Sequence, residues 1–218
     1  MGEYDIFKLI GLIALFIIFL CVCLYANLPT KWTLGSKEMD YAFIRDCELL
    51  SLKEPEMKKL LPANVLWENQ RVLVMVVRRP GCLLCRREAK TLSFLKHTLD
   101  KARVKLIAVV HEKFDVDQFR TYFAGEIYFD KERRFFGPKE RWMPNWHSLL
   151  RVDTFYHLLR AKRAGVEGNS LGEARLLGGV YLLGKGDDGI LFRHYERSYG
   201  DMVNIYKLMG VVMNLAMP

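Results

Sequence analysis

Residues 72–85 of the chain read VLVMVVRRPGCLLC, and this stretch predicts both the fold class and the candidate site. Its first six residues are apolar and mostly β-branched, which is typical of a strand buried on both faces of a sheet. Pro80 and Gly81 end this strand. Cys82 and Cys85 then open a segment whose apolar residues recur with a helical period. A buried strand followed directly by a helix is a building unit of α/β proteins.

The segments that follow alternate between predicted strands and helices. We expect strands at 72–77, 104–110, 126–130, 180–183 and 190–195, and helices at 85–99, 115–123 and 201–215. Asp115 is the expected N-cap of the second helix. A helical insertion at about 131–177 ends in a glycine-rich loop, predicted to be mobile, at 165–179. This order predicts a thioredoxin-like α/β fold, with a mainly parallel sheet completed by a hairpin and a helix.

The sequence GKGDDG at 184–189 matches the spacing of a dinucleotide-binding loop. That loop must lie between a strand and a helix, whereas a predicted strand follows here. We therefore predict a turn between the last two strands.

Cys82 and Cys85 form a CxxC motif at the predicted start of a helix. Four arginines flank it: Arg78, Arg79, Arg86 and Arg87. The helix N-terminus and these positive charges favour an anion, so we expect the pKa of Cys82 to lie below the ordinary ~8.5. One helical turn separates the two sulfurs, within disulfide range. The motif thus predicts an attacking Cys82 thiolate and a resolving Cys85.

Two other interpretations of the motif stay open. A zinc site needs two further ligands, and the chain has no second CxxC and no HxxxH, while Cys47 and the five histidines form no pattern. The pair could also be inert core cysteines, although four flanking arginines are unusual around apolar residues. We predict no metal ion and no bound cofactor, and we interpret Cys47 as a core residue.

The first 30 residues are predicted to be a membrane anchor. Residues 9–26 (LIGLIALFIIFLCVCLYA) are nearly all apolar, and a helix of this length reaches about 27 Å, close to the thickness of a bilayer core. A cleaved signal peptide is the alternative, but Leu24 does not suit a cleavage site after Ala26. The basic residues Lys31, Lys37 and Arg45 follow the span, which predicts a cytosolic domain; secretion is the less favoured alternative.

Composition bounds the remaining possibilities. The chain has 218 residues, 51% of them hydrophobic, which excludes a disordered or low-complexity protein. The net charge of +8 favours anionic partners without selecting nucleic acid, and we expect no nucleic-acid partner. We predict a linker followed by a short helix that contains Cys47 at 31–66, and the redox domain at 67–218.

The insertion is both basic and aromatic. Residues 131–163 hold nine Lys or Arg against three Asp or Glu, interleaved with tryptophan, phenylalanine, tyrosine and leucine. An amphipathic helix that covers the sheet explains this pattern. The alternative is a surface that contacts the membrane, in which Arg133, Arg134 and Arg141 bind anionic headgroups.

Five stretches resemble the peroxiredoxin-like 2 family, and most closely its 2A branch, a group of cytoplasmic antioxidant proteins. They are RRPGCLLCRREA (78–89), AVVHE (108–112), YFAGEIYFD (122–130), LLGGVYLLG (176–184) and GDMVN (200–204). The resemblance extends over 67–215 and includes the N-terminal apolar segment. It implies a thioredoxin-like fold and a redox-active pair at Cys82 and Cys85. An external thiol such as thioredoxin or glutathione would then serve as reductant.

The chain departs from better-known relatives at two places. Typical peroxiredoxins have a proline seven residues and a threonine or serine three residues before the attacking cysteine, where this chain has Met75 and Arg79. We therefore expect slow reaction with peroxide. Thioredoxins place a cis-proline opposite the CxxC motif, where this chain has Gly178 and Gly179, which would let a substrate backbone approach closely.

Three functions are consistent with these observations. The first is a membrane-anchored, redox-regulatory antioxidant that reduces peroxides or disulfides. The second is a reductase of a lipid endoperoxide, as in the related prostamide/prostaglandin F synthase branch. The third is a non-enzymatic protein whose disulfide state controls a partner.

Overall fold

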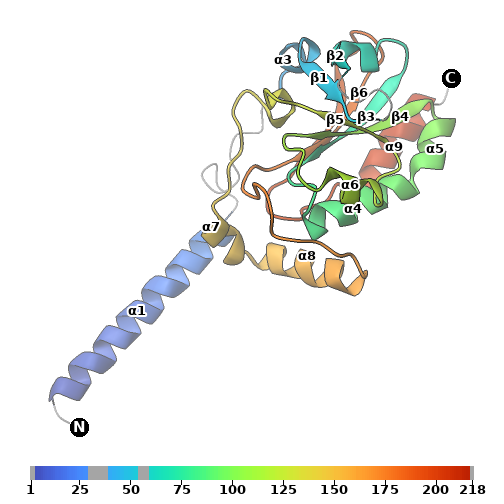
Figure 1. The fold of residues 1–218 in the computed structure, drawn as a ribbon. Helices are drawn as coiled ribbons and strands as arrows, with labels where there is room; N and C mark the ends of the chain where they lie inside the picture. The colour runs from blue at the N-terminus through green and yellow to red at the C-terminus, as the bar shows by residue number, and fades with distance from the viewer. Residues whose placement is uncertain (1–2, 29–38, 54–58, 217–218) are drawn as a thin grey trace.

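The computed structural model describes residues 3–28, 39–53 and 59–216, and in them seven strands form one mixed sheet in the order β2-β1-β5-β4-β3-β6-β7 (Figure 1). The strands are β1 (Glu48–Ser51), β2 (Leu60–Pro62), β3 (Arg71–Val77), β4 (Val104–Val110), β5 (Glu126–Phe129), β6 (Gly179–Leu183) and β7 (Ile190–Tyr195). The helices are α1 (Glu3–Asn27), α3 (Tyr41–Arg45), α4 (Leu83–Phe94), α5 (Lys96–Lys101), α6 (Val116–Arg120), α7 (Asn145–Leu149), α8 (Val152–Arg163) and α9 (Ile205–Ala216). Two 3-10 helices are η1 (Ala63–Leu66) and η2 (Arg134–Phe136).

The centre of the sheet follows the predicted arrangement. Strands β3, β4 and β5 are parallel, and β6 pairs with β3 in the antiparallel direction before β7 completes the hairpin. The residues between β6 and β7 form a turn closed by the Gly184 N–H, which donates to the Gly189 carbonyl at 2.8 Å. This arrangement confirms the expected thioredoxin-like α/β architecture and the turn at 184–189.

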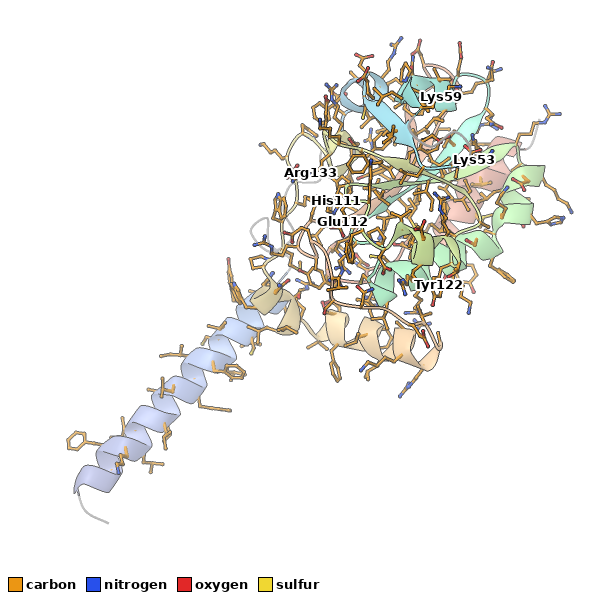
Figure 2. All side chains as sticks on the ribbon, viewed as in Figure 1. Lys53, Lys59, His111, Glu112, Tyr122 and Arg133 are labelled. Carbon is orange, nitrogen blue, oxygen red and sulfur yellow. The ribbon has the colours of Figure 1, made fainter. Side chains whose placement is uncertain are left out.

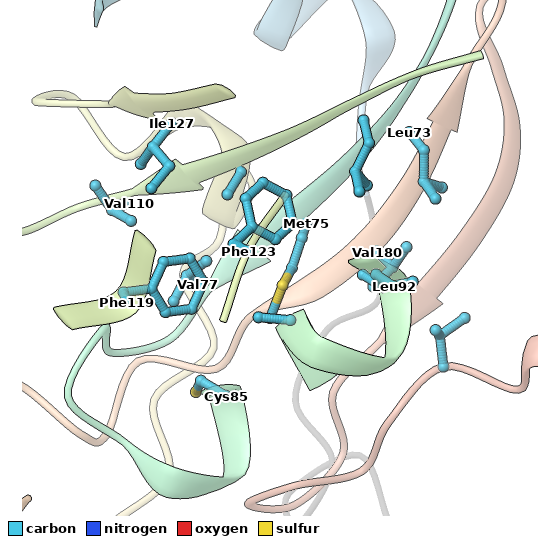
Figure 3. Close-up of a cluster of buried hydrophobic side chains, with 14 of the residues drawn as sticks. Leu73, Met75, Val77, Cys85, Leu92, Val110, Phe119, Phe123, Ile127 and Val180 are labelled. Carbon is cyan, nitrogen blue, oxygen red and sulfur yellow. The ribbon is translucent and has the colours of Figure 1, made fainter. Parts of the chain in front are cut away.

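Both faces of the sheet are covered, which explains the continuous apolar runs in β3 and β4. Leu73, Met75 and Val77 point into one cluster, which α4, α5, α6 and α9 cover (Figure 3). The alternate residues Val72 and Val74 point into a second cluster with α3, η1 and η2. Cys47 is buried in this second cluster, as expected of a core residue.

The range 31–66 contributes more to the sheet than the predicted linker with one helix. The helix is α3, but it ends at Arg45, so the prediction that it contains Cys47 is wrong. Strands β1 and β2 also lie here and pair with each other. β1 continues the sheet by pairing in the antiparallel direction with β5, through Leu50 and Ser51. These two short strands are an addition that the sequence interpretation lacked.

The three predicted helices differ from the structure in detail, and the one expected at 201–215 begins only at Ile205 of α9. The segment 85–99 is two helices, because α4 ends at Phe94 and Leu95 separates it from α5, which begins at Lys96. Asp115 precedes α6, but its backbone is left-handed and its side chain makes no cap hydrogen bond. Its carboxylate accepts from Arg86 and Asn169 instead, so Asp115 occupies the predicted N-cap position of α6 without capping the helix through its side chain.

Helix α1 extends away from the domain, and its side chains stand free along most of its length (Figures 1 and 2). Residues 6–27 form the one helix in the described part of the chain that is long and apolar enough to cross a membrane. By length and composition alone, a signal sequence passes the same test. This helix therefore agrees with either a membrane anchor or a signal.

The insertion is partly helical. It contains η2, α7 and α8, and α8 packs against α4. Residues 164–178 that follow have no helix or regular strand. The expectation that Arg141 faces lipid is wrong, because its side chain is buried and its guanidinium donates to the Glu196 and Gly178 carbonyls.

Candidate redox site

The CxxC motif lies where β3 passes into α4. Cys82 is the N-cap residue of α4, and its carbonyl accepts from the Arg86 N–H at 2.9 Å to close the first turn. Cys85 lies within that turn and belongs to the same buried cluster as Met75 and Val77 (Figure 3). Both cysteine residues are only 5% exposed. The fold thus places two neighbouring thiols at a buried helix N-terminus.

Arg78 is the charged group closest to the motif. Its Nη2 donates to Cys82 Sγ at 3.0 Å, its Nε pairs with Glu196 Oε1 at 3.3 Å, and its Nη1 donates to the Ala174 carbonyl at 3.0 Å. The guanidinium also lies over the Tyr199 ring, 4.2 Å from its centroid. Arg78 is only 2% exposed, and a cation buried to this extent needs anionic partners. Glu196 and an ionised Cys82 are such partners.

The two thiols differ in their readiness to ionise. The pKa of Cys82 lies well below its usual range because the Cys85 thiol donates a hydrogen bond to its sulfur, and because Arg78 and Arg79 add positive charge, against the effect of burial. The pKa of Cys85 lies well above its usual range because of the same hydrogen bond, burial and the neighbouring Cys82 charge. Of the two thiols, Cys82 is therefore the one that ionises more readily.

The other flanking arginines bond elsewhere. Arg79 donates to the Asn169 carbonyl at 2.7 Å. Arg86 donates to the Pro80 and Glu167 carbonyls and forms an ion pair with Asp115 at 2.6 Å. Arg87 lines a surface hollow with Arg160, and burial together with that like charge lowers its pKa. Of the four arginines, Arg78 is thus the one bonded to the sulfur.

The loop at 166–171 covers the N-terminus of α4. The Asn169 N–H donates to the Gly81 carbonyl at 2.8 Å, and Arg79 and Arg86 hold the loop through the carbonyls already described. A Cβ at Gly168 would overlap the backbone of Leu83, so the chain comes very close to the motif here. This cover explains why both sulfurs are buried.

The glycine pair lies beside the end of β3. A Cβ at Gly178 would overlap the Val76 carbonyl and one at Gly179 the His194 carbonyl, so neither position has room for a side chain. The Gly178 N–H donates to Glu196 Oε2 at 3.0 Å. The pair is therefore linked to the motif through Glu196 and Arg78.

Several residues of the site escaped the sequence interpretation. Glu196 directly follows strand β7, and Tyr199 lies three residues later. Nothing in the sequence pairs either residue with Arg78. His111 Nε2 lies 2.8 Å from the Arg78 carbonyl, and Figure 2 shows His111 next to Glu112 in the middle of the domain. Glu88, one turn after Cys85, accepts from the Val203 N–H at 3.0 Å. An acidic residue directly after a predicted strand is the signal that could have pointed to Glu196.

The described residues contain no group of three or more His, Cys, Asp or Glu side chains arranged to hold a metal ion. The zinc interpretation of the motif therefore has no second pair of ligands in this part of the chain.

Comparison with known proteins gives a consistent picture. The AhpC/TSA antioxidant enzyme model matches residues 91–198, beginning after the CxxC motif. Peroxiredoxin-like 2A of Rattus norvegicus is 42% identical over 176 residues, which cover 79% of this chain and 75% of that protein. The Gallus gallus protein of the same name is 41% identical over 185 residues, 84% of this chain and 78% of its own length.

A solved structure supports the fold. A variant of peroxiredoxin 6 from Arenicola marina superimposes with a TM-score of 0.54 at 14% sequence identity, covering 83% of this chain and 74% of that one. At this level of identity the likeness concerns the fold alone.

Proposed function

This chain belongs to the peroxiredoxin-like 2 family, and from that premise we propose that it is an antioxidant thiol–disulfide oxidoreductase whose working pair is Cys82 and Cys85. The observation that carries the proposal is the hydrogen bond from the buried Arg78 to Cys82 Sγ at 3.0 Å. This contact stabilises the thiolate, which is the form that attacks peroxides and disulfides.

The reaction proceeds in two steps. The Cys82 thiolate attacks one oxygen of a peroxide; the O–O bond breaks, a sulfenic acid forms on Cys82 and an alcohol or water leaves. Cys85 then attacks this sulfur, water leaves, and the Cys82–Cys85 disulfide forms. With a disulfide substrate, Cys82 forms a mixed disulfide that Cys85 resolves in the same way. An external thiol reductant, either the dithiol of a thioredoxin or two molecules of glutathione, returns two electrons and restores both thiols.

The surrounding residues have supporting roles in this proposal. Arg78 stabilises the thiolate, and Glu196 orients Arg78 while accepting the Gly178 N–H. Arg79 adds charge, Arg86 holds the covering loop, and Arg87 has no part in the site. No bound metal or cofactor is needed.

A lipid endoperoxide is the second candidate substrate. Trp142, Met143 and Trp146 line an open, mostly apolar pocket of about 600 Å³. The hydroxyl of Tyr199 donates to the Met143 carbonyl at 2.9 Å, and the ring of Tyr199 lies against Arg78. Tyr199 would then lie between an apolar substrate in this pocket and Arg78, which donates to Cys82.

We also propose that α1 anchors the protein in a membrane with the redox domain in the cytosol. Its apolar side chains are exposed rather than packed on the domain, as expected of a helix surrounded by lipid. The basic residues after the span favour the cytosolic side.

Trapping experiments test the redox cycle. Peroxide should convert the reduced protein to the Cys82–Cys85 disulfide, which thioredoxin or glutathione then reduces. Cys85→Ser should accumulate a mixed disulfide on Cys82 with an added thiol, and Cys82→Ser should form neither product. Cys47→Ser is the matched control, because Cys47 is buried on the other side of the sheet.

Mass spectrometry of the trapped peptides gives the readout. A mixed disulfide on Cys85 in the Cys82→Ser protein would reverse the assigned roles. A cycle that forms the disulfide but never turns over with a reductant would favour a redox-gated interaction protein over an enzyme.

A further inference from the structure

Helix α8 has an apolar stripe on its outer side. Four large side chains at spacings of three and four residues share this side: Val152 (72% exposed), Phe155 (61%), Tyr156 (53%) and Leu159 (39%). The opposite side contains the buried Thr154 and Ala161 and packs on α4. A surface helix ordinarily turns its apolar side to the core, so the arrangement in α8 is the reverse.

The stripe continues into α7 and ends in basic residues. Leu149 is 80% exposed and Trp146 is 56% exposed, directly before α8 begins. The last turn of α8 has the basic residues Arg160, Lys162 and Arg163. Apolar and aromatic side chains flanked by basic ones are typical of helices that lie in the interface of a bilayer.

The end of α1 is hydrogen-bonded to the junction between α7 and α8. Asn27 Nδ2 donates to the Leu150 carbonyl at 2.9 Å, and the Val152 N–H donates to Asn27 Oδ1 at 3.0 Å. Arg151 Nη1 donates to the Ala26 carbonyl at 3.0 Å. Figure 1 shows α8 starting beside the end of α1 and running along the outside of the domain. If α1 spans a bilayer, the surface of that bilayer at the C-terminal end of α1 therefore lies next to the stripe.

We propose that the stripe formed by Trp146, Leu149, Val152, Phe155, Tyr156 and Leu159 lies in the headgroup interface of the same phospholipid bilayer that α1 spans. The inference rests on the proposed anchorage of α1 and adds a second, peripheral contact. Because α8 packs on α4, this contact holds the helix that begins at the CxxC motif close to the lipid surface.

This membrane contact through apolar side chains differs from the contact through arginines that the basic composition of the insertion suggested. Arg133 and Arg134 form ion pairs with Glu140 and Glu132, and Arg141 is buried. The exposed apolar side chains of α8, rather than these arginines, form the surface that would enter the bilayer.

Fluorescence quenching in vesicles tests this docking. The full-length protein is reconstituted into phosphatidylcholine–phosphatidylserine vesicles that contain phosphatidylcholine brominated near the glycerol end. Phe155→Trp adds an indole to the stripe, and we expect the brominated lipid to reduce the added emission about two-fold, because interfacial helices lie at this depth. Leu60→Trp adds a comparably exposed indole on β2, at the end of the domain far from α1, and should not be quenched (Figure 1).

The controls separate docking from anchorage. Adding Val152→Ser and Leu159→Ser to the Phe155→Trp protein should abolish the quenching while the protein still floats with the vesicles through α1. Equal quenching of both indoles, or no quenching of either in protein that floats, would overturn the docking alone. Failure of the unaltered protein to float would overturn the anchorage and the docking together. Circular dichroism establishes that each variant is folded.

Discussion

At the scale of single residues, the site is organised around one buried cation. Arg78 has the Cys82 sulfur, the Glu196 carboxylate and the Tyr199 ring as its neighbours. Removing one partner of a buried ion pair typically costs about 3–5 kcal/mol. Because the buried Arg78 cation needs anionic partners, the fold favours a negative charge on Cys82 as well as on Glu196.

Glu88 gives a prediction at this scale. Burial raises the pKa of Glu88 from about 4.5 to about 8, although the hydrogen bond from the Val203 N–H to its carboxylate acts in the opposite direction. The protonated form is thus favoured in the folded state, and the stability it contributes is present below about pH 4.5 and lost as the pH rises through about 8. We expect Glu88→Gln to be more stable than the unaltered protein at pH 8 and above, and similar to it near pH 4.5.

Urea unfolding across this pH range measures the difference. Asp117→Asn serves as the control, because the Asp117 side chain is 94% exposed. A Glu88→Gln protein whose stability relative to the unaltered chain is the same at every pH would contradict the raised pKa.

At the scale of elements, the junction between β3 and β6 leaves no room beside the motif. A Cβ at Gly178 would overlap the Val76 carbonyl, which belongs to a central strand and cannot move away easily. We expect Gly178→Ala to lower the free energy of unfolding by about 1–3 kcal/mol through overpacking.

Gly210 is the matched control for this substitution. It lies in α9 with no atom within 4 Å of an added Cβ, so Gly210→Ala should raise the stability by about 0.5–1 kcal/mol through helix propensity. Chemical denaturation measures both variants. Equal effects of the two substitutions would contradict the close approach at Gly178.

The elements also show how far sequence reasoning extends. The central strands could be predicted because β3 and β4 are long apolar runs that are buried on both faces. Strands β1 and β2 have four and three residues, too few for a periodic signal. Their partners come from the fold, because β1 pairs with β5 and β2 pairs with β1. The split between α4 and α5 at Leu95 likewise has no glycine or proline to mark it.

The local features of the site could be predicted from the sequence, but its long-range contacts could not. The position of the cysteines at a helix start follows from the local sequence, and so does the presence of positive charge. The choice of Arg78 over Arg86 and Arg87 depends on Glu196, which is 118 residues away in the sequence. Contacts at such a distance are set by the fold and not by local pattern.

At the scale of the whole molecule, we expect the loop that covers the motif to slow its reaction with peroxide. Both cysteine residues are nearly buried, and Met75 and Arg79 stand where typical peroxiredoxins have proline and threonine or serine. Removal of one oriented hydrogen-bonding group from a catalytic site costs on the order of 10²-fold in rate. We expect hydrogen peroxide to oxidise Cys82 at least that much more slowly than it oxidises a typical peroxiredoxin.

Stopped-flow fluorescence of the reduced protein measures this rate. The Arg79→Thr variant restores a hydroxyl at the expected position and tests whether the missing group is the cause. An unaltered protein that reacts as fast as a dedicated peroxidase would contradict the expectation.

The central claim is that the fold makes Cys82 the ionised thiol of the pair. It is tested most directly by the pH dependence of iodoacetamide labelling of the reduced full-length protein, with each cysteine followed by peptide mass spectrometry. We predict that Cys82 is labelled with a midpoint below the ordinary ~8.5, that Cys85 resists labelling at the same pH, and that Arg78→Met moves the Cys82 midpoint upward. Faster labelling of Cys85 at neutral pH, or a Cys82 midpoint at or above ~8.5, would contradict the account.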